Sequence, residues 1–382
     1  MKTIQFLSLF VISGFAFSIE NPNVLLIMVD DMNTMLSTYG HKQVKTPNLE
    51  KLKKEGVQFN KAYVQYPQCT ASRTSMLTGL YPDQTGVTQL RQHFRNFVPE
   101  AKTLPQIFIE KGYYTARFGK IFHYDNPSAI GTSGNDDIYT WDQTVNPYGR
   151  DKIEEYKIKT LVPRKYGAIL SWLAADGKDE EQTDGIAASE AIEKLDDFAN
   201  TDTPFFLAVG FFRPHTPFVA PKKYFDLYER EKIEIPEISS DYLATLPELA
   251  VKSVRAKESQ LNLEKERAKE IKEAYYATIS FVDAQVGRIL DQLETSGLDK
   301  NTVVVITSDH GYHLGEHGHW QKNTLFENAT RVPLIIAAPS SENKGAKSIS
   351  PVSYTHLRAH ETPEHRLRRH MREKKKGGGG GG

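Results

Sequence analysis

Two acidic segments carry the side chains best suited to hold a metal ion. The apolar run NVLLIMV is followed directly by Asp30 and Asp31. The run NTVVVITS is followed by Asp309 and His310. Three carboxylates and an imidazole form a mainly oxygen ligand set, which favours a hard divalent cation such as Ca²⁺ or Mg²⁺. The alternative for either pair alone is that its aspartates only cap turns or helices.

The segment PQCTASRTSMLTG contains Cys69, the only cysteine among 382 residues. Small hydroxylated residues surround it, and Arg73 follows four positions later. One helical turn would place Cys69 and Arg73 on the same face of a helix. The N-terminus of that helix would add backbone N–H groups that favour an anion. The segment therefore predicts a site for phosphate or sulfate, whereas a buried structural cysteine needs no such neighbours.

Four other polar side chains follow apolar runs and could join the same site. Taken singly, a histidine or lysine of this kind is more often structural or solvated. All four, however, follow predicted strands, so they should lie at the sheet edge where the acidic pairs end. They are Lys120 and His123 in FGKIFH, His215 in FFRPHTPF and Lys322 in EHGHWQKNTLFE.

The order of apolar runs and helical patterns predicts an α/β fold with a mostly parallel, wound sheet. In such sheets ligands gather at the carboxyl ends of the strands. The middle of the chain, about 125–200, is less regular and is interpreted as loops that shape a substrate cleft. Strands are expected over 23–31, 61–66, 204–212, 301–311 and 332–339, helices over 46–59 and 265–298, and a helix followed by a strand over 103–120.

Composition and the chain ends limit the function further. The 48 basic and 48 acidic residues give no net charge, which argues against a nucleic-acid-binding protein. Residues 1–18 have the pattern of a secretory signal peptide: Lys2, an apolar run, and the small residues Ala16 and Ser18 before a cleavage point. The alternative, a membrane anchor, is weaker because the apolar run is shorter than the ~20 residues needed to span a bilayer. No later segment is expected to span a membrane. Residues 350–382 are rich in Arg, His, Lys and Gly and are interpreted as a non-native or disordered tail.

The cysteine segment also carries a resemblance. CTASR followed by TSMLTG resembles the signature of type I sulfatases, C-x-(P/A)-S-R with a downstream T-G, and Ala71 takes the place where many members have proline. The segments NVLLIMVDDMN, GKIFH, RPHTPF and SDHGYHLGEHGHWQKNTLFENATRVPLI resemble iduronate-2-sulfatase and its bacterial relatives. The resemblance covers about residues 22–340, in order and at plausible spacing.

The resemblance implies an alkaline-phosphatase-like fold, with a large, mostly parallel central sheet flanked by helices. Residues 19–349 would form the catalytic domain. Members usually continue into a smaller antiparallel subdomain, which we expect this chain to lack. The resemblance also implies a sulfated carbohydrate as substrate, and the signal-peptide pattern predicts export to a secreted or periplasmic location.

The resemblance further implies that a formylglycine-generating enzyme oxidises Cys69 to formylglycine (3-oxoalanine). One cation, Ca²⁺ or alternatively Mg²⁺, would be held by Asp30, Asp31, the modified Cys69, Asp309 and His310. Arg73, Lys120 and Lys322 would neutralise the sulfate. His215 would protonate the leaving alcohol, and His123 would act as a base.

Two alternatives stay open from the sequence. A phosphatase or phosphonate hydrolase of the same superfamily could use a similar anion site, since sulfate and phosphate share a tetrahedral shape. A secreted glycan-binding relative without activity is the second alternative, although such a protein should have lost some of these polar residues.

Overall fold

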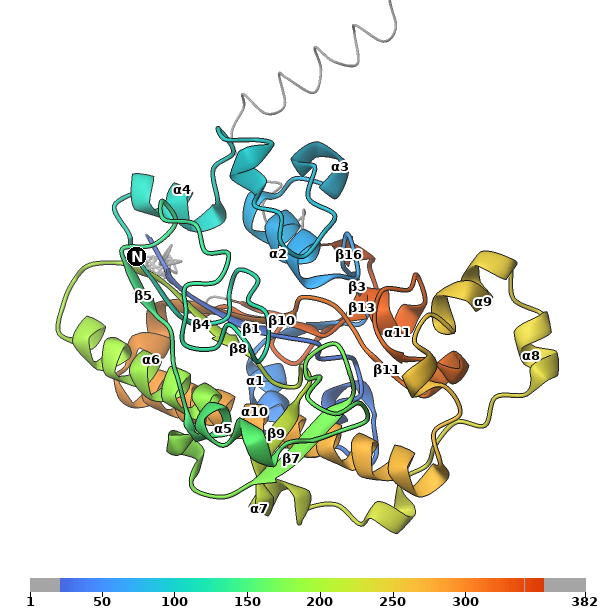
Figure 1. Cartoon of the computed structure of the whole chain (residues 1–382). Coiled ribbons are helices and arrows are strands. Elements are labelled where there is room, and N and C mark those ends of the chain that lie inside the picture. Colours follow the sequence, from blue (N-terminus) through green and yellow to red (C-terminus); the bar gives the residue numbers. More distant parts are fainter. Residues whose placement is uncertain (1–20, 340, 354–382) are drawn as a thin grey trace, which may run out of the picture.

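An eight-stranded sheet forms the centre of the protein in the computed structural model, which describes residues 21–339 and 341–353 (Figure 1). The predicted signal peptide and most of the predicted tail lie outside the described residues. The strands β10, β1, β8, β4 and β5 run parallel, whereas β14 is antiparallel to β10 and β2. The strand order is β15 (Lys347–Ser348), β2 (Val57–Phe59), β14 (Leu334–Ala337), β10 (Thr302–Ser308), β1 (Asn23–Val29), β8 (Phe205–Phe211), β4 (Tyr114–Gly119) and β5 (Gln143–Val145).

Strand β1 is apolar throughout because both of its faces are covered. Leu25 and Ile27 belong to one core cluster, together with Ile279 of α10. Leu26 and Met28 point the other way, into a second cluster that includes residues of α2. A strand buried on both faces reads as a continuous apolar run, which is the pattern that predicted it.

Helices cover both faces of the sheet, as Figure 1 shows. One face packs against α1, α6 and α10, and the other against α2, α3 and α4. The remaining helices, α5, α7, α8, α9 and α11, are short and lie around the margin of the sheet (Figure 1). The bounds are α1 (Pro47–Glu55), α6 (Thr183–Ala199), α10 (Lys265–Thr295), α2 (Cys69–Thr78), α3 (Pro82–Thr85), α4 (Leu104–Glu110), α5 (Arg150–Ile153), α7 (Lys222–Phe225), α8 (Ser240–Ala244), α9 (Glu248–Val254) and α11 (Glu327–Thr330).

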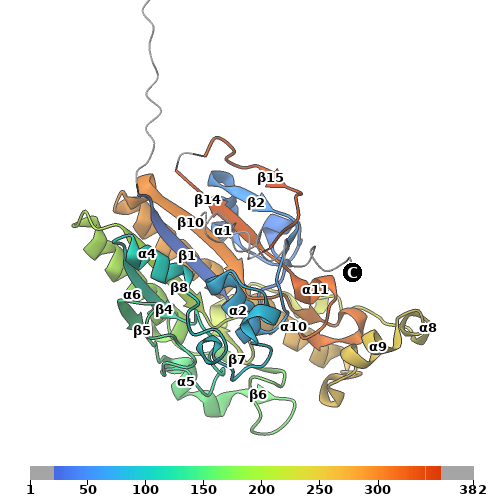
Figure 2. The same cartoon turned by 90° about the horizontal axis from the view of Figure 1, so that it is seen from above.

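Three small sheets and one projecting arm surround this centre. Figures 1 and 2 both show α8 and α9 at the margin of the molecule, away from the large sheet. We call these two helices the α8–α9 arm. The small sheets are β6 (Lys159–Thr160), β7 (Ser171–Ala175) and β9 (Phe218–Pro221); β13 (Arg331–Val332), β3 (Ala62–Tyr63) and β16 (Val352–Ser353); and β11 (His313–Leu314) with β12 (Trp320–Gln321).

The predicted fold class is confirmed, and two local expectations are wrong. The helix expected within 46–59 stops at Gly56 as predicted, although Val57, which was counted in its apolar pattern, begins strand β2. The strand expected over 61–66 is only Ala62–Tyr63, and it lies outside the large sheet. The region 125–200, expected to be loops, contains the 17-residue helix α6 under the sheet.

No helix within the described ranges 21–339 and 341–353 is both long and apolar enough to cross a membrane.

Candidate active site

Four neighbouring parallel strands deliver most of the candidate residues to one edge of the sheet. Parallel strands end on the same side, so the residues that follow them are brought together. The order β10, β1, β8, β4 thereby assembles groups that lie far apart in sequence. Asp309 and His310 follow β10, Asp30 and Asp31 follow β1, His215 follows β8, and Lys120 and His123 follow β4.

Cys69 is the first residue of α2 and is buried, with 1% of its surface exposed. Its Sγ lies 3.2 Å from Nε2 of His310 and 3.3 Å from Nζ of Lys322. Burial alone would raise the pKa of the thiol, but Lys322 and His310 lower it well below its usual range. The surroundings of Cys69 therefore favour negative charge, as the sequence predicted for an anion site.

Arg73 is fully buried one helical turn after Cys69, as predicted, and holds two acids. Its Nε donates to Asp309 Oδ2 at 2.8 Å, and its Nη2 lies 3.2 Å from Asp30 Oδ1. Nη1 donates to the main-chain oxygens of Lys120 and Ile121 at 2.7 and 2.9 Å. Although burial acts against the charge, Asp309 and Asp30 raise the pKa of Arg73. The guanidinium thus ties the end of β4 to the acidic centre.

Two lysines pair with the aspartates that follow β1. Lys120 contacts Asp30, and both side chains are completely buried. Nζ of Lys322 lies 2.5 Å from Asp31 Oδ1. Burial would raise the pKa of Asp30, but Lys120 lowers it. Burial would lower the pKa of Lys322, and Asp31 raises it instead. The two pairs bring a lysine to each of the aspartates that follow β1, and Lys322 also lies 3.3 Å from Cys69 Sγ.

The residues present fit a divalent cation. Asp30, Asp31, Cys69 and His310 each offer a ligand atom, and these atoms lie within 4.8 Å of one another. Asp30 Oδ1 and Asp31 Oδ2 are buried without a hydrogen-bond partner among the residues that the structure describes. His310 Nδ1 lies 3.0 Å from the carbonyl of Gly311, to which it must donate, so Nε2 is the ring nitrogen that would become a ligand on losing its proton. Burial alone would lower the pKa of His310, but the neighbouring Asp309 raises this pKa to about 9.

Asp309 sits at the centre of the candidate residues but is more fully bonded than the other acids. Its Oδ1 accepts N–H bonds from Asp31 at 3.1 Å and from His310 at 3.0 Å. Its Oδ2 accepts from Arg73. Burial and the nearby Asp30 carboxylate raise the pKa of Asp309, while Arg73 opposes them. Its carboxylate therefore orients the two acidic segments toward each other, in addition to being a candidate ligand.

The two candidate acid–base histidines lie at the border of the cluster. His215 Nε2 is 3.9 Å from Asp31 Oδ2, and its Nδ1 is 2.6 Å from the Thr216 carbonyl, which can only accept. Nε2 of His215 is thus the nitrogen free to exchange a proton. His123 lies 3.2 Å from Asp125 Oδ1. All ten residues singled out in the sequence therefore converge on one region.

Some supporting residues gave no signal in the sequence. Tyr275 of α10 donates its hydroxyl to the Asp31 carbonyl at 2.7 Å and accepts the N–H of Asn33 at 3.0 Å. Asp31 itself has a φ of +65°, so this tyrosine holds the acidic turn in a left-handed conformation. Ser72, inside the predicted cysteine segment, donates to the main-chain oxygen of Asp309. Only the position of Ser72 beside Cys69 could have suggested a role.

Strands β4 and β8 approach closely where the site begins. Lys120 N–H donates to the carbonyl of Gly210 at 2.8 Å. A Cβ on Gly210 would lie 1.9 Å from the carbonyl oxygen of Lys120. Gly119 has a φ of +77°, and a Cβ there would lie 2.2 Å from the Gly210 oxygen. Glycine is therefore required at both positions to bring Lys120 to Asp30.

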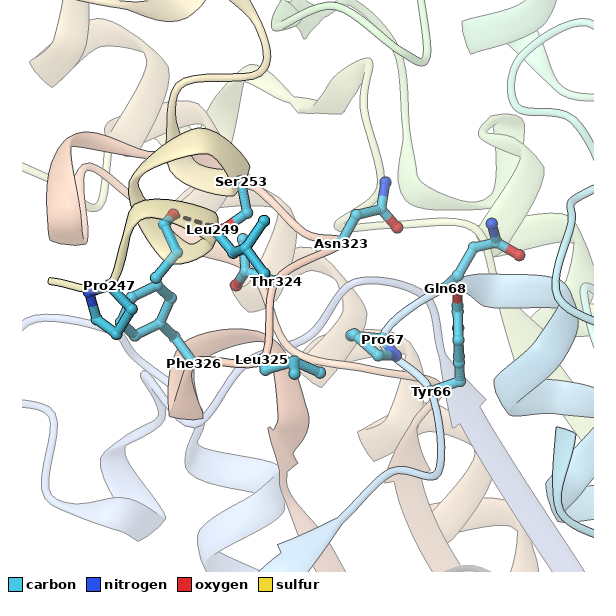
Figure 3. A pocket seen from close by; sticks show the side chains of 11 residues that line it. Tyr66, Pro67, Gln68, Pro247, Leu249, Ser253, Asn323, Thr324, Leu325 and Phe326 are labelled. Atoms are coloured by element: carbon cyan, nitrogen blue, oxygen red, sulfur yellow. Dashed lines mark hydrogen bonds between the residues drawn. The ribbon is translucent and has the colours of Figure 1, made fainter. Parts of the chain in front are cut away.

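A pocket of about 690 Å³ lies beside the cluster. Its walls include Gln68, the neighbour of Cys69, and Asn323, the neighbour of Lys322. Figure 3 shows Pro247, Leu249 and Phe326 on one side and Tyr66, Pro67 and Gln68 on the other. The pocket is mainly apolar and connects the α8–α9 arm with the segments that carry Cys69 and Lys322.

Comparisons with known proteins agree with this geometry. The sequence profile of the family described as Sulfatase matches residues 22–360. A sulfatase of Formosa agariphila is 35% identical over 347 residues, which cover 87% of this chain and 67% of that protein. Iduronate 2-sulfatase of Mus musculus is 35% identical over 337 residues, which cover 83% of this chain and 59% of that enzyme.

The solved structure of a phosphonate monoester hydrolase of Agrobacterium radiobacter matches with a TM-score of 0.69 and 23% sequence identity, covering 87% of this chain and 71% of that one. The fold is that of an alkaline-phosphatase-like α/β protein. With the profile match and the two relatives, the chain belongs to the sulfatase family.

Proposed function

We propose that this protein is a sulfuric ester hydrolase that removes sulfate from a sulfated sugar or polysaccharide. The observation that carries the proposal is the environment of Cys69. Its Sγ lies 3.2 Å from His310 Nε2 and 3.3 Å from Lys322 Nζ, beside two buried carboxylate oxygens without hydrogen-bond partners in the described part of the chain. A nucleophilic group on the side chain of residue 69 would thus face His310, Lys322 and the candidate cation site.

We propose further that Cys69 is converted to formylglycine, so that its sulfur stands in for the oxygens of that group. The hydrated aldehyde supplies one hydroxyl to attack sulfur and a second hydroxyl through which sulfate is released. One divalent cation, Ca²⁺ with Mg²⁺ as the alternative, would supply Lewis-acid polarisation of a sulfate oxygen. Asp30, Asp31, Asp309 and His310 would hold it together with residue 69.

The cationic side chains prepare the site for a sulfate ester. Arg73, Lys120 and Lys322 are held in place by their carboxylate partners, so they need little reorganisation when a substrate arrives. Their charges would bind the outer oxygens of the sulfate and hold its sulfur in position for attack.

Proton transfer falls to the two histidines. His215 fits the acid that protonates the leaving alcohol, because its Nδ1 is fixed by Thr216 and Nε2 faces the cluster. His123 fits the base that removes a proton from residue 69, with Asp125 orienting its ring. Both roles need a side chain that can donate and accept a proton, and imidazole has a nitrogen for each task.

Two partners follow from the proposal. A formylglycine-generating enzyme would be needed for maturation, and a sulfated carbohydrate would be the substrate. The names of the relatives support the substrate class, since one of them is iduronate 2-sulfatase. We place the mature enzyme outside the cytoplasm, secreted or periplasmic, where sulfated polysaccharides are met.

The test begins with co-expression of the chain and a formylglycine-generating enzyme. Mass spectrometry of the peptide that spans Cys69 should show the aldehyde in place of the thiol. The converted protein should then release sulfate from sulfated sugars, and Cys69→Ala, produced in the same cells, should release none.

An intact thiol beside a converted reference sulfatase would contradict the proposed nucleophile. The same preparation should be given an aryl sulfate, an aryl phosphate and an aryl phosphonate. A preference for either phosphorus ester would favour the phosphatase or phosphonate hydrolase alternative. Absence of turnover on all of these and on sulfated sugars by a converted, folded protein would favour the glycan-binding alternative.

A further inference from the structure

A half-buried lysine outside the ten candidate residues lies next to the site. Lys257 follows α9 and precedes the short 3-10 helix Glu258–Gln260. Its Nζ donates to the main-chain oxygen of Ala168 at 3.0 Å and to the side-chain oxygen of Gln321. Both acceptors are neutral, and none of the described residues offers Lys257 a carboxylate within ion-pair distance.

Three separate segments converge on this ammonium group. The segment after α9 carries Lys257, the loop before β7 carries Ala168, and β12 carries Gln321. Gln321 is 3% exposed and has a φ of +86°, and its Nε2 also donates to Ala168 O at 2.9 Å. Gln321 is buried and its backbone is left-handed, so its contacts hold it in one place. The Lys257 ammonium group that bonds to it is therefore held in a defined position.

Lys257 lies close to Lys322, one of the candidate catalytic lysines. Gln321 contacts Lys257, and the next residue, Lys322, contacts Cys69. Burial and the charge of Lys322 lower the pKa of Lys257 to about 8, while Asp31 opposes them. Two neighbouring ammonium groups repel each other, and Lys322 has a carboxylate partner whereas Lys257 has none. An anion beside Lys257 would offset this repulsion with an attraction of its own.

The same loop also indicates on which side of the site Lys257 lies. Thr216, the neighbour of His215, donates to the carbonyl of Gly167, and the next carbonyl, that of Ala168, accepts from Lys257. Since His215 is the proposed acid for the leaving alcohol, Lys257 lies on the leaving-group side. The sugar that departs from the sulfate should therefore pass this residue.

We propose that Lys257, positioned by Ala168 and Gln321, binds a second anionic group on the leaving sugar, either a carboxylate or a second sulfate. The inference rests on the proposed function for the identity of the leaving group. It makes the substrate an acidic sugar rather than a neutral sugar monosulfate. Charge-assisted hydrogen bonds in a partly buried site are strong enough to discriminate such substrates.

The test compares three sulfated sugars that differ in one further substituent: a hydroxymethyl group, a carboxylate or a second sulfate. The converted wild-type enzyme should show kcat/KM values about tenfold or more higher for an acidic sugar than for the neutral one. Lys257→Gln should lose this preference with the neutral sugar unaffected, and Lys257→Arg should keep most of it. Lys252→Gln is the matched control, because Lys252 is exposed on α9.

The acidic sugar that loses most in Lys257→Gln identifies the carboxylate or the sulfate as the natural group. An equal loss of kcat/KM on all three sugars would mean that Lys257 only supports the fold. An unchanged preference for acidic sugars would mean that another residue binds the anionic group. Either result overturns the inference.

Binding of the corresponding desulfated sugars, measured by calorimetry, separates this inference from the proposed function. If no sulfate ester is turned over, the proposed function fails. Tighter binding of the acidic sugar that is lost in Lys257→Gln would still support the anion site. Equal binding of neutral and acidic sugars by the wild type would overturn it.

Discussion

At the scale of single residues, the site is a set of charges paired before any substrate arrives. Lys120 pairs with Asp30, Lys322 with Asp31, and Arg73 with Asp309. Buried pairs of this kind add little net stability, because desolvation offsets most of their attraction. Their value lies in fixing cationic groups around residue 69.

Replacing Cys69 by serine tests the need for an aldehyde. The serine hydroxyl can accept sulfate, but its carbon lacks the second hydroxyl that would expel it. Product should therefore stop at about one equivalent per enzyme, and the intact mass should show a bound sulfate group. Quantifying the released alcohol against the enzyme concentration checks this outcome. Repeated turnover by Cys69→Ser would rule out the formylglycine mechanism.

A divalent cation should stabilise the folded protein through the same residues. A ligand at about one hundred times its dissociation constant stabilises the native state by ~2.7 kcal/mol, which corresponds to a rise of roughly 3 °C in Tm for a chain of this length. Calcium should therefore raise the Tm of the wild type and leave that of Asp31→Asn unchanged. Asp299→Asn, an exposed aspartate, is the control and should keep the shift. An equal shift in Asp31→Asn would place the cation elsewhere.

At the scale of elements, strand ends and helix ends determine where these charges lie. The adjacent parallel strands β10, β1, β8 and β4 supply most of the site, and α2 supplies its cysteine and arginine. The close approach of β4 and β8 leaves no room for a side chain between them. Long-range contacts from α10 then hold the turns that follow the strands.

Gly210→Ala should damage both stability and activity. The added Cβ would meet the main-chain carbonyl of Lys120, which cannot move without shifting β4. We expect a loss of about 3 kcal/mol in the free energy of unfolding, with a lower kcat/KM because Lys120 is displaced. Denaturant unfolding and sulfate release measure the two effects. Gly112→Ala, with a φ of +83° and nothing within 4 Å, should cost only ~1 kcal/mol and keep activity.

The contact between α10 and α1 predicts a dependence of stability on pH. Asp283 of α10 accepts N–H bonds from Asn48 and Leu49 at the start of α1, at 3.1 and 2.8 Å. Burial raises the pKa of Asp283 to about 6. An unfolded aspartate has a pKa of ~3.9, so between these values the native state keeps a proton that the unfolded state releases. The free energy of unfolding should therefore fall as the pH rises toward 6.

The measurement is the difference in unfolding free energy between the wild type and Asp283→Asn at several pH values. This difference should shrink by up to about 3 kcal/mol from pH 4 to 6 and then stay level. Asp299→Asn should show no such trend. A constant difference for Asp283→Asn would mean that this carboxyl is ionised throughout.

At the scale of the whole molecule, the sequence predicted the fold class and the convergence of the ten residues. Apolar runs that end in polar residues indicate strand ends, and parallel strands bring those ends together. The antiparallel direction of β14 was not predictable, since an apolar run carries no direction. Helix α6 was missed because its buried face includes Ala187, Ala188 and Ala191, whose small side chains give a weak apolar pattern.

Supporting contacts were beyond the reach of sequence patterns for a different reason. Tyr275 lies in the middle of a long amphipathic helix, where a tyrosine is usual, and only the packing of α10 brings it to Asp31. Lys257 lies among other charged residues, and only its contact with Gln321 distinguishes it. Residues of this kind depend on which elements become neighbours in space.

The burial of Cys69 sets an order of events during biosynthesis. Its sulfur is covered by contacts with His310 and Lys322, which lie 241 and 253 positions later in the chain. If a modifying enzyme acts on Cys69, it must do so before these late segments join the sheet edge. Folding and oxidation would then compete in time, and the folded population would preserve the state that each molecule had when it folded. The fraction of active molecules would then be determined during synthesis and folding, and modifying enzyme supplied later could not raise this fraction.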